Sequence, residues 1–167
     1  GKLREAAEFA AYGYPIDPDS GIPESAIPAT LAALAAESVA TSGARVFEFK
    51  IARHSLDVDI ATVLAVRATL GPDVAIHVDA NMNYTMEEAR KFLASVAGAG
   101  LGNFEEPVAS LVEMERLHTE FGVPLSTHRV LVDAIRRFPG IAAGGQRPAA
   151  PRRHRRHAGA DARCRCG

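Results

Sequence analysis

Two motifs rich in carboxylate groups each close a short hydrophobic run of the sequence, at residues 79–81 (Asp-Ala-Asn) and 105–107 (Glu-Glu-Pro). A lysine, Lys50, closes an earlier run of the same kind. Carboxylate oxygens are the ligands that Mg²⁺ prefers, and Mg²⁺ sites keep positions open for substrate. A lysine that is shielded from water beside a cation favours its neutral, basic form. The combination predicts a proton-abstraction site, in which the cation stabilises an enolate while the amine takes the proton.

These residues can act together only if the secondary structure brings them to one place. The sequence alternates between short β-branched or aromatic runs and stretches with the apolar spacing of a helix. The runs predict strands at residues 45–51, 74–79, 101–106 and 123–127, with a weaker candidate at 6–14. The amphipathic stretches predict helices at residues 24–40, 56–70, 85–98, 110–121 and 131–138.

Five βα units in succession predict a parallel sheet, either doubly wound or closed as a barrel. No glycine-rich phosphate loop follows any predicted strand, which disfavours a dinucleotide-binding fold. Polar residues instead collect at the carboxyl ends of the strands, where barrel enzymes carry their active sites; they are Lys50, Asp79, Asn81, Glu105 and Glu106. A complete barrel takes roughly 250 residues. We therefore predict an α/β fold, a partial (β/α)₈ TIM barrel of about five βα units.

Several of these residues also have an ordinary structural interpretation. Taken singly, Asp79 or Glu105 could cap the helix that follows its strand, but the spaced set with Lys50 favours a site. Glu106 is predicted to contact neighbouring structure rather than metal. His77 lies in the middle of a predicted strand and is expected to be a core histidine. His128 is either a residue beside the metal or a hydrogen-bonded loop histidine.

The ordered motifs resemble a known family. Residues 47–50 (Phe-Glu-Phe-Lys), 79–81 and 104–107 (Phe-Glu-Glu-Pro) are similar to the enolase superfamily, in its mandelate racemase/muconate lactonizing enzyme branch. The resemblance covers about residues 1–140 and is most specific between 44 and 138. It implies Mg²⁺-assisted abstraction of a proton α to a carboxylate. By position, Asp79 and Glu105 match the first two metal ligands, Lys50 the catalytic base, and Asn81 a site residue beside the metal.

Within the branch, the resemblance is strongest to glucarate dehydratase-like proteins. Those proteins place an asparagine in a Thr-Asn pair on the fifth strand, as third metal ligand, and Thr127-His128 falls at that position. The resemblance implies a Mg²⁺-dependent acid-sugar dehydratase, a carbon–oxygen lyase acting on a small acid sugar. A full-length form is expected to be a homo-oligomer. The alternatives are a racemase or cycloisomerase of the same superfamily, or a non-catalytic scaffold whose basic C-terminal tail binds nucleic acid.

The sequence departs from the family pattern in three ways. The Lys-x-Lys pair of the family reads Glu48-x-Lys50, and a carboxylate near Lys50 favours its charged form and weakens it as a base. His128 is a poor ligand for Mg²⁺, because imidazole suits Zn²⁺, Fe²⁺, Ni²⁺ or Cu²⁺ better. The last three barrel strands and the capping domain of the family are not visible. We therefore expect this chain, as a truncated form, to have little or no activity.

Composition narrows the class of protein. The chain has 167 residues, of which 47% are hydrophobic and 23% charged, which suits one globular domain. No run approaches the roughly 18 apolar residues of a membrane span, and no apolar signal core follows the first residues. The two cysteines, Cys164 and Cys166, cannot form a disulfide framework. We expect a cytoplasmic protein without a membrane partner.

The last 26 residues differ from the rest. We divide the chain into a partial barrel domain, residues 1–141, and an Arg-rich tail, residues 142–167, which holds seven arginines and one acid and is predicted to be disordered. The tail could be a basic arm for nucleic acid, or a metal site formed by His154, His157 and the two cysteines, although their spacing is not that of a zinc finger. We favour a third interpretation, translation out of frame, because GC-rich DNA then yields Arg, Ala, Gly and Pro. Nucleic acid is therefore not an expected partner.

Overall fold

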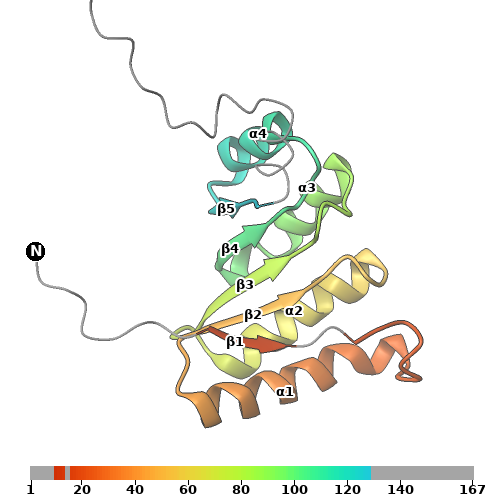
Figure 1. Ribbon diagram of the computed structural model, residues 1–167, viewed down its shortest axis with the longest axis vertical. Helices are drawn as coiled ribbons and strands as arrows, with labels where there is room; N and C mark the ends of the chain where they lie inside the picture. The colour runs from red at the N-terminus through yellow and green to blue at the C-terminus, as the bar shows by residue number, and fades with distance from the viewer. Residues whose placement is uncertain (1–9, 14–15, 129–167) are drawn as a thin grey trace, which may run out of the picture.

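The computed structural model describes residues 10–13 and 16–128. Five parallel strands form one sheet in the order of the sequence, and helices separate them along the chain (Figure 1). The strands are β1 (Ala10–Gly13), β2 (Val46–Lys50), β3 (Ala75–Asp79), β4 (Leu101–Glu105) and β5 (Leu125–Ser126). The helices are α1 (Ile27–Ser42), α2 (Leu56–Leu70), α3 (Met86–Ser95) and α4 (Leu111–Phe121), with short 3-10 helices η1 (Glu24–Ala26) and η2 (Ala97–Ala99).

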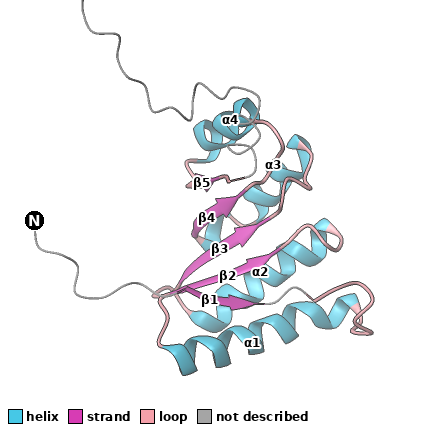
Figure 2. Cartoon of the chain, in the orientation of Figure 1, coloured by secondary structure: helices cyan, strands magenta, loops and turns pink. Residues whose placement is uncertain are grey.

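Each strand has one face toward the helices and one face away from them. In β2, Phe47 and Phe49 are buried, with ring centroids 5.8 Å apart, whereas Glu48 and Lys50 lie on the opposite face. The same alternation in β3 buries Ile76 and Val78. Consecutive helices contact one another along the outer layer, so that strands and helices form a curved two-layer wall (Figure 2). We refer to the strand face turned away from the helices as the inner face.

Aromatic side chains link the two layers between β4 and α3. The rings of Phe92 and Phe104, both fully buried, lie 5.2 Å apart by centroid, and Tyr84 packs 5.7 Å from Phe92. Helix α3 begins with a capping box, because the Thr85 side chain accepts from the Glu88 backbone N–H while the Glu88 carboxylate accepts from the Thr85 N–H. These local signals are in the sequence, which explains why the start of this helix was predictable.

The inner face carries a polar row across four strands. Pairing places Tyr12 opposite Glu48, Glu48 opposite His77, and His77 opposite Asn103. The Asn103 side-chain amide donates to Ser126 Oγ at 2.7 Å, which extends the row to β5. The expectation that His77 is a core histidine was wrong. It alternates with the buried Ile76 and Val78 and so lies on the inner face, where its side chain is only partly buried.

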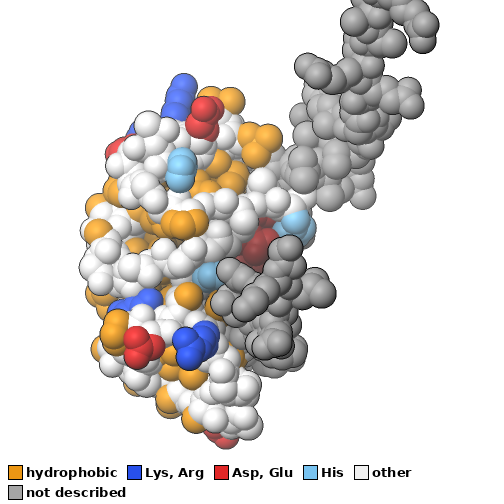
Figure 3. Space-filling view, turned by 90° about the vertical axis from the view of Figure 1, so that its left-hand side faces the viewer, with side chains coloured by type: hydrophobic (Ala, Val, Ile, Leu, Met, Phe, Trp, Pro, Cys, Tyr) orange, Lys and Arg blue, Asp and Glu red, His pale blue; other side chains and the backbone are white. Residues whose placement is uncertain are grey.

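The predicted α/β fold is confirmed as a partial barrel wall. The helix predicted at residues 56–70 coincides with α2, and the strand at 123–127 shortens to Leu125–Ser126. The helix predicted at 131–138 and the tail at 142–167 lie outside the described residues, so the proposed domain division stays a prediction. Within the part of the chain that the structure describes, no helix is long and apolar enough to cross a membrane. Apolar side chains cover much of the face seen in Figure 3, with a few separated charged groups.

Candidate active site

The predicted site residues of three strands lie side by side at the carboxyl edge of the sheet. Strand register pairs Lys50 with Asp79, Asp79 with Glu105, and Glu105 with Ser126. Backbone hydrogen bonds continue this register past the strand ends, from Ile51 N–H to Asp79 O at 2.9 Å among others. The sheet therefore gathers the lysine and both carboxylates into one row.

Asp79 is the most enclosed of these groups, with 5% of its surface exposed. Lys50 Nζ donates to Asp79 Oδ2 at 2.5 Å. Asn81 donates twice to the same carboxylate, from its backbone N–H to Oδ1 at 2.8 Å and from its side-chain amide to Oδ2 at 2.9 Å. The ammonium of Lys50 and two amide donors of Asn81 thus fix the orientation of the Asp79 side chain.

Glu105 faces His128, which follows β5. His128 Nδ1 lies 2.7 Å from Glu105 Oε1, and the histidine side chain is 62% exposed. Glu106 holds the segment that carries His128 in place. Its Oε1 accepts from the His128 N–H and from Thr127 Oγ1, both at 3.1 Å. Glu106 is fully buried, so the prediction that it contacts neighbouring structure is confirmed. His128 thus makes a hydrogen bond to a predicted metal ligand, and its role beside the metal stays a prediction.

The loops that follow the strands at this edge have unusual backbone conformations. The backbone φ values of Asn81, Met82 and Glu106 are 48°, 62° and 44°. They lie in the left-handed region, which residues other than glycine rarely adopt. The Met82 N–H donates to Glu106 O at 2.7 Å, and the Ala80 N–H donates to Glu105 O at 3.1 Å. The two loops are therefore bonded to each other directly beside Asp79 and Glu105.

Glu48 lies one pleat below Lys50 on the inner face. Burial raises the pKa of Glu48 above 4.5, and the negative charges of Glu105 and Asp79 raise it further, against the opposing effect of Lys50. His77 Nδ1 is 3.8 Å from Glu48 Oε2, and burial lowers the pKa of His77. Gly102 leaves room for this ring, because a Cβ at that position would lie 3.1 Å from the imidazole. Glu48 thus shares the inner face with the site but belongs to the layer beneath it.

Sequence analysis missed a buried pair that supports the loops behind the site. Asp59 Oδ2 accepts from Tyr84 Oη at 2.7 Å and from the Ala52 N–H at 3.0 Å. Burial raises the pKa of Asp59 above its usual value, despite these two donors. The signal was present in the sequence, since Asp59 shares the apolar face of α2 with Val63 and Val66. A carboxylate at a core-facing helix position indicates a satisfied buried acid.

The donor set fits Mg²⁺ in part. Asp79 and Glu105 supply the carboxylate oxygens that Mg²⁺ prefers, from adjacent strands. The third candidate, His128, supplies an imidazole nitrogen, which does not suit Mg²⁺. Across residues 10–13 and 16–128, no three His, Cys, Asp or Glu side chains are already gathered around one point where a metal ion would bind. The carboxylates are engaged by Lys50, Asn81 and His128 instead.

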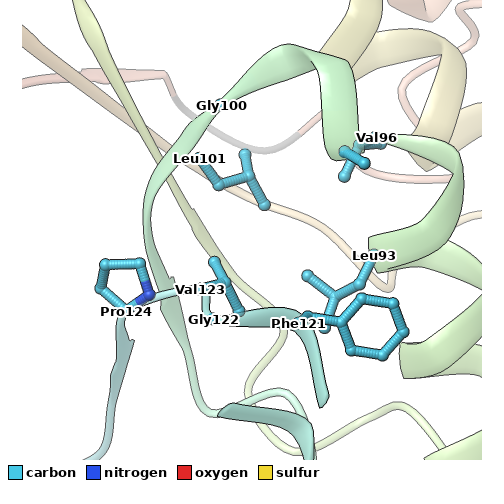
Figure 4. A pocket seen from close by; sticks show the side chains of 9 residues that line it. Leu93, Val96, Gly100, Leu101, Phe121, Gly122, Val123 and Pro124 are labelled. Atoms are coloured by element: carbon cyan, nitrogen blue, oxygen red, sulfur yellow. The ribbon is translucent and has the colours of Figure 1, made fainter. Parts of the chain in front are cut away.

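The opposite edge of the sheet has a different character. A cavity of about 220 Å³ lies between α3, α4 and the starts of β4 and β5. Figure 4 shows its lining, in which Leu93, Val96, Leu101, Phe121 and Val123 surround the space. The labelled side chains carry no titratable group, so this cavity offers no acid, base or metal ligand.

Comparisons with known proteins agree with the fold and with the order of the motifs. Residues 30–147 match the model of the enolase C-terminal domain-like family, which is more than half of the chain. The chain therefore belongs to this family, and the resemblance to the mandelate racemase/muconate lactonizing enzyme branch of the enolase superfamily is confirmed.

Three relatives illustrate the range of the family. Arabinonate dehydratase from Saccharolobus solfataricus is 37% identical over 86 residues, covering 50% of this chain and 23% of the relative. Muconate cycloisomerase 1-1 from Acinetobacter lwoffii is 34% identical over 86 residues, covering 52% of this chain and 23% of the relative. The crystal structure of an isomerase from Streptomyces coelicolor A3(2) superposes with a TM-score of 0.68 at 22% identity, over 81% of this chain and 39% of that one.

The relatives establish the superfamily but not one reaction within it. The chain is similar to a lyase and to an isomerase of one superfamily, and the superposition shows the shared barrel fold. The matched segment spans about a quarter of each of the two curated relatives. The activity, the substrate and the metal of this chain are therefore proposals.

Proposed function

We propose that the carboxyl edge of this sheet is a site for metal-assisted abstraction of the proton α to a carboxylate, in an acid-sugar dehydratase. The observation that carries the proposal is the row Lys50–Asp79–Glu105, in which Lys50 Nζ lies 2.5 Å from Asp79 Oδ2 and Glu105 pairs with Asp79. A base and two adjacent oxygen ligands are the minimum set for this chemistry. The arabinonate dehydratase relative supports a dehydratase as the first candidate.

In this proposal Asp79 and Glu105 hold the divalent cation, which is Mg²⁺ in the family resemblance. When bound, the cation supplies positive charge for the enolate that forms as the proton leaves. Asn81 is a positioning residue, because its two hydrogen bonds fix the orientation of the Asp79 carboxylate. This orientation decides which oxygen of Asp79 stays available to a ligand.

Lys50 is the catalytic base. Its ammonium donates to Asp79 Oδ2 in the structure, and a protonated amine cannot accept a proton. Asp79, when it holds the metal, would no longer accept from Lys50, which would free the amine to take the proton. The side chain of Lys50 is 40% exposed, so that the amine can reach substrate on the open inner face.

The second candidate function is a cycloisomerase of the same superfamily, favoured by the muconate cycloisomerase relative. Both reactions include a proton transfer at the carbon α to a carboxylate, so the residues described here do not separate them. The products do, because a dehydratase releases water from the substrate whereas a cycloisomerase product is an isomer of the substrate. The sheet of the described residues has five strands and an open inner face. We therefore propose that this chain exchanges the α-proton slowly, whereas little or no substrate is turned over to product.

The test is exchange of the α-proton with solvent. Glucarate and arabinonate are incubated in D₂O with Mg²⁺ and stoichiometric amounts of the 167-residue protein, and loss of the α-proton signal is followed by NMR. We expect slow exchange that needs the metal and is reduced at least about 100-fold in Lys50→Met, since general-base catalysis contributes about 10²–10⁴.

Two variants separate the roles of base and metal ligand. Lys50→Met is expected to keep metal binding, whereas Asp79→Asn is expected to lose both metal binding and exchange. Circular dichroism verifies that each variant is folded. Absence of exchange in the folded wild-type protein contradicts the proposal for this chain, as does exchange that persists in Lys50→Met.

A further inference from the structure

We infer that His128 makes this site select a first-row transition-metal dication over Mg²⁺. The inference rests on the proposed function and concerns the identity of its cation. It starts from the one place where the donor set does not suit Mg²⁺, the imidazole beside Glu105. His128 would act there as a third ligand with Asp79 and Glu105.

Backbone hydrogen bonds and strand pairing fix the position of His128 in the fold. Ser126 pairs with Glu105, and the Glu106 N–H donates to Ser126 O at 2.9 Å. The His128 backbone N–H then donates to the buried Glu106 carboxylate at 3.1 Å. The residue is therefore anchored through its main chain, while its ring is left exposed to solvent and turned toward Glu105.

A shared cation would replace the hydrogen bond between His128 and Glu105 and would separate the two donor atoms slightly. His128 Nδ1 and Glu105 Oε1 are 2.7 Å apart. Two neighbouring ligand atoms that each lie about 2.1 Å from one metal ion, with an angle of about 90° between the two bonds, are about 3 Å from each other. Insertion of a cation between Glu105 and His128 therefore asks for a small displacement of an exposed ring.

The chemical types of the three proposed ligands decide which cation binds most tightly. Two carboxylates alone favour hard cations such as Mg²⁺, which prefers an oxygen environment. An imidazole nitrogen adds affinity for Fe²⁺, Co²⁺, Ni²⁺ or Zn²⁺, in the order that first-row dications follow at nitrogen ligands. Mg²⁺ gains little from the same nitrogen. The set Asp79, Glu105 and His128 thus favours transition metals through one residue.

The test compares Co²⁺ and Mg²⁺ binding in His128→Asn by calorimetric titration. Asparagine removes the imidazole and offers an amide oxygen, which Mg²⁺ accepts. We expect Co²⁺ affinity to fall at least about 10-fold, since even residues that only orient metal ligands contribute 10–100-fold. Mg²⁺ affinity is expected to stay the same or rise. All proteins carry His154→Asn, His157→Asn, Cys164→Ser and Cys166→Ser, so that the tail contributes no Co²⁺ ligands.

A matched control and a spectroscopic readout complete the experiment. His118→Asn changes another exposed histidine, at the end of α4, and is expected to leave both affinities unchanged. In the unsubstituted site, paramagnetic Co²⁺ is expected to shift the ring resonances of His128 more strongly than those of His118. Loss of this difference overturns the inference.

The outcomes distinguish this inference from the proposed function. If Asp79→Asn abolishes binding of both metals while His128→Asn changes neither, the proposed function stands and His128 is not a ligand. If His128→Asn weakens both metals equally, His128 orients Glu105 through its hydrogen bond, and the selectivity inference is overturned. If Asp79→Asn leaves both affinities intact, the proposed function fails and this inference fails with it.

Discussion

The two edges of the sheet differ in how the backbone turns. At the amino edge, helices end in glycines with positive φ, such as Gly43 at 67° and Gly122 at 68°, where glycine adopts the left-handed region without steric cost. At the carboxyl edge the positive-φ positions between β2 and α4 are not glycine; they are Ala52, Asn81, Met82 and Glu106. A side chain in this region costs about 1 kcal/mol or more. The cost of unfavourable backbone conformation is thus concentrated at the edge that carries the acids and the lysine.

Packing shows the same contrast. The amino edge encloses the apolar cavity lined by Leu93 and Phe121, whereas the carboxyl edge holds carboxylates in hydrogen bonds. In barrel enzymes the carboxyl edge carries catalysis and the amino edge carries stability. This contrast predicts that stability and the proposed metal site can be changed separately in this chain. Variants at one edge, measured for their effect on the other edge, test this separation.

The largest effect on stability is expected at the amino edge. Leu93→Ala removes a buried side chain of α3 and enlarges the cavity, which lowers the free energy of unfolding by about 3 kcal/mol. Metal affinity at the opposite edge is expected to be unchanged. Urea denaturation followed by circular dichroism, together with calorimetric metal titration, measures both quantities. A change in metal affinity of more than about threefold, or about 0.7 kcal/mol, would break the separation of the two edges.

A pair of opposite substitutions tests the backbone contrast. Gly122→Ala is expected to lower the free energy of unfolding by about 1 kcal/mol, because its φ of 68° disfavours alanine while no atom lies within 4 Å of the added Cβ. Ala52→Gly is expected to leave it unchanged or raise it by up to about 0.5 kcal/mol, as relief of the 60° φ outweighs the entropy of glycine in the unfolded chain. Urea denaturation measures both, and a destabilised Ala52→Gly protein would show that the loop is not strained.

The smallest effect concerns Glu48 and depends on pH. Since the pKa of Glu48 is raised in the folded protein, its ionised form destabilises the fold, and this contribution grows as pH rises above 4.5. Glu48→Gln is therefore expected to be more stable than the wild type near pH 7, with the difference vanishing below pH 4.5. Denaturation at several pH values measures the trend. A difference that stays constant with pH would show that charge is not the cause.

Much of the fold could be predicted because its signals are local. The helix at residues 56–70 and the cap at Thr85 follow from apolar spacing and neighbouring side chains, without reference to distant residues. The parallel sheet followed from the repeated βα pattern. The grouping of Lys50, Asp79 and Glu105 then followed from strand ends alone, because parallel strands end at one edge.

The features that could not be predicted depend on side chains that are distant in the sequence. The bond between Asp59 and Tyr84 needs the packing of α2 against the loop before α3. The proximity of His128 to Glu105 depends on the register of β5, which is set by backbone contacts after β4. By contrast, the inner-face position of His77 could have been predicted, because Ile76 and Val78 alternate with His77 and Asp79 along β3.

The order of the strands has a kinetic consequence. Every strand in the sheet pairs with strands that precede or follow it directly in the sequence, from Ala10 with Val46 to Phe104 with Leu125. No pairing in the described sheet waits for a distant segment, so each loop closure is short and its entropic cost is similar. Folding can therefore begin at one βα unit and proceed unit by unit during synthesis, as it does in repeat proteins.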